Sequence, residues 1–181
     1  KKVLENLNVS KKSFKLYSSI LDYPKPGLEP KVWNFDGTIK LEVKTQALNK
    51  LYKFIESQGY NPQEIINKIY IVGSLTSYQY NRLTDLDIHV YLNLQNMLGV
   101  FKGEESELIE LIDKNWRKTL NKAESEKIEG TQHPLEFYFE IPEDLSVAPS
   151  DGVYDLLNDT WLKEPKVITV DFDIEKIYPE I

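Results

Sequence analysis

Apolar residues recur at helical spacing in three segments of the chain, residues 3–22, 40–57 and 105–125. The second segment is the most regular, and its apolar face is formed by Val43, Ala47, Leu48, Leu51 and Ile55. The third is expected to bury Leu108, Ile109, Leu111, Ile112, Trp116 and Leu120. A short fourth helix is expected from Asn61 to about Lys68, because asparagine followed by proline is typical of a helix cap and first turn.

Apolar runs between these helices predict the strands of a sheet. Residues 68–73, 86–94 and 134–141 are the expected strands, and 152–162 is expected to form a hairpin that turns at Asn158-Asp159. Side chains alternate along 86–94, which separates Asp87, His89 and Tyr91 on one face from Leu86, Ile88, Val90 and Leu92 on the other. Helices that alternate with strands favour an α/β or α+β domain, with a mixed sheet flanked by helices.

The domain organisation follows from one proline-rich stretch. Residues 22–30 contain three prolines and a glycine, which predicts a loop or linker. We therefore expect residues 1–30 to form an N-terminal helix with its linker. Residues 31–181 are expected to form one domain that ends in the hairpin and one further strand.

Composition narrows the class of protein. The 181 residues are 41% hydrophobic, which is ample for a folded core. A formal net charge of −7 disfavours broad contact with long nucleic acid, and makes divalent cations the expected intermediaries for a polyanionic nucleotide. Cysteine is absent, which excludes disulfide partners and fits a cytoplasmic protein. No apolar run reaches the roughly 18 residues of a transmembrane helix, so no membrane partner is expected.

Two carboxylates, Asp85 and Asp87, stand at the start of an otherwise apolar strand. Alternate strand residues project to one face, about 7 Å apart along the chain. Two carboxylates placed in this way can bridge divalent cations, and Mg²⁺ prefers such oxygen ligands, with Mn²⁺ as the alternative metal. A pair of these ions activates an attacking oxygen and stabilises a leaving oxygen in nucleotidyl transfer. A solvated edge strand is the other interpretation.

Gly73 ends the preceding strand, and ten residues separate Ser74 from Asp85. Residues 75–83 are expected to form a short helix that returns the chain beside the first strand. Backbone N–H groups at such a turn bind phosphate oxygens, and glycine permits a close approach. The sequence therefore predicts a triphosphate-binding turn that faces the two aspartates.

A third carboxylate is expected from a neighbouring strand. Residues 134–141 offer Glu136 and Glu140, which share a face with Tyr138. Glu136 is favoured because Glu140 directly precedes the end of the strand, although both stay candidates.

Together these motifs resemble the nucleotidyltransferase superfamily that includes DNA polymerase beta. More closely, the chain resembles a group of predicted nucleotidyltransferases encoded by tailed bacteriophages. The similarity runs through "KLEVKTQALNKL", "GSLTSYQYNRLTDLDIHVYL", "LEFYFE" and "DGVYDLLNDTWLKEP", over roughly residues 30–165. It implies a polymerase-beta-like fold and, for a phage protein, a place in the host cytoplasm. By position it implies that Asp85, Asp87 and Glu136 bind metal and that Gly73 and Ser74 hold the triphosphate.

The resulting hypothesis is a Mg²⁺-dependent enzyme that moves a nucleoside monophosphate from an NTP to a hydroxyl and releases pyrophosphate. The acceptor is open among an RNA end such as that of tRNA, a protein and a small molecule. The rival is a non-catalytic module that keeps the fold and binds a nucleotide or a protein. Only the enzyme requires all three carboxylates.

Further polar and aromatic residues carry open alternatives. His89 is either a ligand of a substrate phosphate or a structural histidine bonded to a carboxylate. Arg82 either contacts phosphate or is an exposed side chain. Tyr78, Tyr80, Tyr154 and Trp161 either stack on a base or pack against the protein. The acidic alternation at 171–175 lacks an upstream Gly-Ser and is expected to be a polar strand edge.

Overall fold

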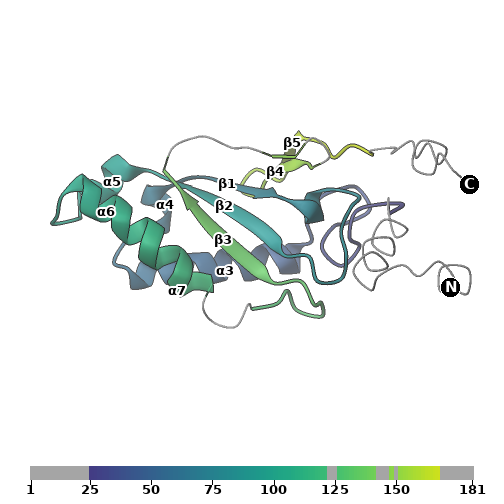
Figure 1. Ribbon diagram of the computed structural model, residues 1–181, viewed down its shortest axis with the longest axis horizontal. Helices are drawn as coiled ribbons and strands as arrows, with labels where there is room; N and C mark the ends of the chain where they lie inside the picture. Colours follow the sequence, from purple (N-terminus) through teal and green to yellow (C-terminus); the bar gives the residue numbers. More distant parts are fainter. Residues whose placement is uncertain (1–24, 122–125, 142–146, 149–150, 168–181) are drawn as a thin grey trace, which may run out of the picture.

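A five-stranded mixed sheet forms the centre of the computed structural model, which describes residues 25–121, 126–141, 147–148 and 151–167. The strands are β1 (Ile66–Val72), β2 (Leu86–Leu92), β3 (Leu135–Glu140), β4 (Val153–Asp155) and β5 (Thr160–Lys163), in the spatial order β3-β2-β1-β4-β5. β2 and β3 are parallel, whereas the other neighbouring pairs are antiparallel. The predicted α+β class with a mixed sheet is therefore confirmed (Figure 1).

One face of the sheet packs on α3 (Leu41–Ser57). Its predicted apolar face is confirmed, since Val43, Ala47, Leu51 and Ile55 are buried in the core. In β2 the alternate residues Leu86, Ile88, Val90 and Leu92 are buried in the same core. Asp87 and His89 consequently project from the face opposite α3.

The predicted helix 105–125 runs beside β3 as three pieces: α6 (Glu105–Leu111), a π-helical turn (Ile112–Trp116) and α7 (Arg117–Asn121). Trp116 is buried, and its ring meets those of Phe54, Tyr60 and Phe139. Asn121 pairs with the backbone of Phe137 in both directions, at 2.8 Å and 3.0 Å. These contacts fix both ends of α7 relative to β3.

Several predicted boundaries are wrong, and strand pairing accounts for one of them. The helix that begins at Pro62 ends at Ile65, because the next residue already pairs with Leu92 across the sheet. Strand β2 ends at Leu92, and α5 (Leu94–Leu98) follows, with Asn93 as its cap. Of the residues expected to be buried in the third helix, Ile109 and Leu111 are half-buried instead.

The short helix expected at 75–83 is also wrong in extent, since only a single 3-10 turn, Ser74–Thr76, forms there. Polar side chains accept hydrogen bonds from backbone N–H groups that would bond to carbonyl oxygens in a longer helix. The Ser77 hydroxyl accepts from the N–H of Gln79, and the Asn81 side chain accepts from the N–H of Leu83. The chain nevertheless returns beside β1, as predicted.

The C-terminal hairpin is confirmed as β4 and β5, with Asp159 at a φ of 53° in the turn. Its Trp161 packs against Trp33, which ties the hairpin to the segment before α3. No helix among the described ranges is long and apolar enough to cross a bilayer. The helix expected at 3–22, the last strand and the acidic alternation at 171–175 lie outside the described residues.

Candidate functional site

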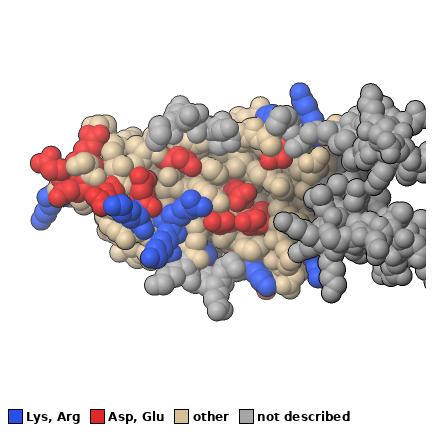
Figure 2. All heavy atoms as spheres, in the orientation of Figure 1, with Lys and Arg blue, Asp and Glu red and all other residues tan. Residues whose placement is uncertain are grey.

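Three carboxylates converge on the face of the sheet opposite α3. Asp85 directly precedes β2, and Asp87 pairs in register with Glu136 of the parallel strand β3. One oxygen from each of the three lies within 4.8 Å of the others, and all three residues are half-buried. Figure 2 shows acidic side chains gathered near the middle of this face, with lysine and arginine side chains beside them. Oxygens at such spacing could hold a divalent cation.

The register also separates the two glutamates of β3. Glu136 lies opposite Asp87, whereas Glu140 lies opposite Tyr91, four residues farther along the strand. The Glu140 carboxylate is 2.9 Å from Nδ1 of His89. Of the two open candidates, only Glu136 joins the aspartates, and His89 takes the structural alternative of a histidine bonded to a carboxylate.

Gly73 follows β1 and lies against the Asp87 carboxylate. Its φ of 79° and ψ of −171° belong to a region that only glycine adopts readily. A Cβ at this position would overlap the Asp87 Oδ2 atom. Ser74 is exposed and begins the 3-10 turn. Glycine is therefore required here on two counts, its backbone conformation and the closeness of the carboxylate.

The turn that carries Gly73 is held from beneath by Thr76 and Gly152. The buried Thr76 hydroxyl lies 2.7 Å from the Gly73 carbonyl oxygen and 2.9 Å from that of Gly152, so it donates to either one. The N–H of Gly152 in turn donates to the Thr76 carbonyl, at 2.8 Å. This clamp brings Asp151 toward the three acids.

Replacing Thr76 by valine is expected to lower the free energy of unfolding by about 1–3 kcal/mol, because a buried carbonyl loses its donor. Thr76→Ser keeps the hydroxyl, so its cost is limited to one methyl group, about 1 kcal/mol. Denaturant unfolding of both variants measures the difference. A valine variant as stable as the wild type would show that the hydroxyl does not hold the turn.

The acids repel one another strongly without a cation. Burial raises the pKa of the Asp87 carboxyl to about 7, and the charges of Asp85, Glu136 and Asp151 add to this effect. The guanidinium of Arg117 lowers the pKa and opposes them. A bound divalent cation would relieve this repulsion, because it favours the ionised carboxylates.

Arg117 comes from the first residue of α7 and lies over β3. Its guanidinium carbon is 3.9 Å from the centre of the Tyr138 ring, and its Nη2 is 3.4 Å from the Glu136 carboxylate. The Tyr138 ring also stacks on His89, with 4.7 Å between ring centres. Burial, followed by the charges of Asp87 and Glu136, raises the pKa of Tyr138 to about 12, which keeps this hydroxyl protonated.

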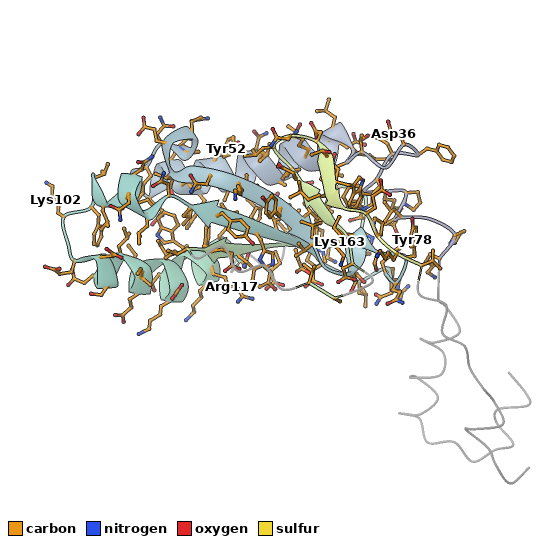
Figure 3. All side chains as sticks on the ribbon, turned by 90° about the horizontal axis from the view of Figure 1, so that it is seen from above. Asp36, Tyr52, Tyr78, Lys102, Arg117 and Lys163 are labelled. Atoms are coloured by element: carbon orange, nitrogen blue, oxygen red, sulfur yellow. The ribbon has the colours of Figure 1, made fainter. Side chains whose placement is uncertain are left out.

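The aromatic residues that were left open between stacking on a base and packing against the protein lie away from the three acids. Tyr80 and Tyr154 are buried in the core, and Arg82 is exposed in the loop before β2. Tyr78 and Trp161 line a cavity of about 630 Å³ whose wall contains none of the three acids. Figure 3 shows Tyr78 near Lys163 at the end of the sheet, away from Arg117. We therefore place the candidate chemistry at the acids and not in this cavity.

Two charged residues at the site were missed by the sequence analysis. Arg117 sits within a predicted helix, and periodicity alone does not show that this position faces β3. Asp151 precedes the hairpin, where an Asp-Gly pair indicates a turn and not a site. Both reach the acids only through tertiary contacts.

No family model matches the chain, and no curated protein or solved structure is significantly similar to it. The resemblance to nucleotidyltransferases therefore stays a hypothesis that rests on the motifs themselves.

Proposed function

We propose that this protein is a divalent-cation-dependent nucleotidyltransferase with a polymerase-beta-like fold. The observation that carries the proposal is the meeting of three carboxylates, one oxygen each within 4.8 Å, beside the glycine turn that ends β1. A bound cation would relieve the repulsion among acids that the sheet register holds together, and Mg²⁺ or Mn²⁺ fits a set of ligands made only of oxygens.

In the proposed reaction the acceptor hydroxyl oxygen bonds to the α-phosphorus of an NTP, and the bond from that phosphorus to the bridging oxygen breaks, which releases pyrophosphate. Bound Mg²⁺ would activate the acceptor oxygen and stabilise the leaving oxygen. Asp85, directly before β2, and Asp87, on β2, would hold the metal together with Glu136 of β3, and Glu136 would accept the hydroxyl proton. Gly73 and Ser74 would bind the triphosphate through the exposed turn.

Labelled NTPs test this proposal most directly. Wild-type protein with Mg²⁺ or Mn²⁺, each of the four NTPs and cell extract is expected to release pyrophosphate and label an acceptor. Asp85→Ala/Asp87→Ala is expected to lower the rate at least about 1,000-fold, since loss of metal removes several kcal/mol of transition-state stabilisation. Asp113→Ala, which removes an exposed acid of the π-helical turn, is the matched control and should keep full activity.

A binding measurement separates the enzyme from the non-catalytic module. Mn²⁺ together with a non-hydrolysable NTP analogue should bind the wild type and not the double variant. Binding that is equal in both proteins, or turnover that persists in the double variant, contradicts the assignment.

A further inference from the structure

The two flanks of the acidic site differ, and each flank can receive one substrate. Strand β2 carries Asp87 and lies between β1 and β3. The glycine turn follows β1, while Glu136 lies on β3 at the opposite side of Asp87. Under the proposed function the triphosphate occupies the Gly73 flank. The acceptor then approaches along the Glu136 flank.

Arg117 is the cationic side chain of this acceptor flank. Figure 3 shows it on the side of the sheet opposite Tyr52 of α3, which is the side that carries the acids. Its side chain is 49% exposed, and the contact of 3.4 Å with Glu136 is long for a hydrogen bond. A guanidinium has five N–H donors in a fork that matches an oxyanion. Among the residues that the structure describes, Glu136 is its one hydrogen-bond partner.

Aromatic neighbours support the position of this guanidinium, in addition to the ion pair. Trp116, the preceding residue, is anchored in the core by three aromatic rings. The face of Tyr138 supports the guanidinium plane. Such half-exposed ion pairs contribute about 0–1 kcal/mol to stability. A π-helical turn directly before Arg117 adds a feature that is frequent at functional sites.

We propose that the acceptor carries an oxyanion, a phosphate or a carboxylate, close to the hydroxyl that is modified, and that Arg117 binds this oxyanion. The inference deepens the proposed function and rests on it. The Arg117 guanidinium lies over Tyr138 and 3.4 Å from the Glu136 carboxylate, so an oxyanion that it binds lies close to the oxygen that Glu136 would deprotonate. The three carboxylates of the site would repel an anionic acceptor, and Arg117 offsets that repulsion.

A first titration tests the proposed function independently of Arg117. Mn²⁺ with a non-hydrolysable NTP analogue is titrated into full-length wild type and Arg117→Gln by calorimetry. Both proteins should bind and reach saturation, because Arg117 lies on the opposite flank from Gly73. Loss of its charge beside Glu136 is expected to change the Mn²⁺ affinity modestly, and the titration measures that change. Failure of the wild type to bind removes the proposed function and this inference with it.

A second titration tests the acceptor. Glycerol, glycerate and glycerol 3-phosphate, which share a hydroxyl and differ in the anion, are titrated into the saturated complex. At least one anionic probe should bind about tenfold or more tightly than glycerol. Arg117→Gln should remove that preference and leave glycerol unchanged, while Arg117→Lys should restore part of it. Preference for glycerol 3-phosphate over glycerate assigns a phosphorylated acceptor, and the reverse assigns a carboxylate.

Lys118→Gln is the matched control, because this exposed neighbour on α7 carries the same charge. Equal binding of glycerol and both anions by the wild type overturns the inference, as does an Arg117→Gln variant that keeps the preference. A Lys118→Gln variant with the same loss would also overturn it, since the effect would then be one of net charge. In each of these cases a normal first titration leaves the proposed function standing.

Discussion

Replacing Asp87 by asparagine is expected to stabilise the metal-free protein at pH 8 by about 1–3 kcal/mol. The carboxyl is partly buried beside three other acids, and its pKa is raised from an ordinary value of 3.8 to about 7. The unfolded chain therefore releases this proton at lower pH than the folded protein does. The resulting loss of stability begins near pH 4, grows until about pH 7 and stays constant above it. Asparagine carries no charge and avoids this loss.

Denaturant unfolding in a chelator, at pH 4 and at pH 8, measures the effect. The two proteins should be nearly equally stable at pH 4, and the variant should be more stable at pH 8. Asp113→Asn, at an exposed position, should show no such pH-dependent gain. An Asp87→Asn variant that is less stable at pH 8 would mean that the repulsion is already relieved by the fold.

Divalent cations are expected to make the wild type more stable than Asp87→Asn at pH 8. Mg²⁺ or Mn²⁺ that binds only the folded state raises its stability, by about 2.7 kcal/mol at a concentration 100 times the dissociation constant. The wild type should show this rise, while Asp87→Asn should show little of it because the variant loses an anionic ligand. The same carboxylate is thus expected to lower stability without metal and to raise it with metal.

The second large effect is expected from Gly73→Ala. The new methyl group would overlap the Asp87 carboxylate, in a backbone conformation that alanine rarely adopts. We expect a loss of about 2–4 kcal/mol in unfolding free energy, the sum of backbone strain and overpacking. The proposed activity should fall at least about 100-fold, because a displacement of about 1 Å in a reacting geometry has that effect.

Two comparisons separate strain from the contact with Asp87. Gly59 also has a positive φ, 85°, but an added Cβ there meets no atom within 4 Å, so Gly59→Ala measures strain alone. In an Asp87→Ala background the cost of Gly73→Ala should fall, because backbone strain then remains without the clash with the carboxylate. If it does not fall, the carboxylate is not what forbids a side chain at Gly73.

Much of the fold could be predicted because its signals are local. The apolar face of α3, the alternation along β2 and the turn at Asp159 each depend on neighbours within a few residues of one another. The sequence also indicated that Gly73 faces Asp85 and Asp87, because these residues flank one loop. Predictions were wrong where distant residues decide, as at Ile66, which pairs with Leu92 and so ends a helix early.

The sequence by itself therefore determined which residue types are available for chemistry, namely Gly73, Asp85, Asp87 and two candidate glutamates. Tertiary structure alone decided which of them meet. The parallel register of β2 and β3 places Glu136, and not Glu140, beside Asp87. Contacts of the buried Trp116 bring Arg117 over Tyr138. Register and packing depend on residues far apart in the chain, so no local pattern of apolar and polar positions contains them.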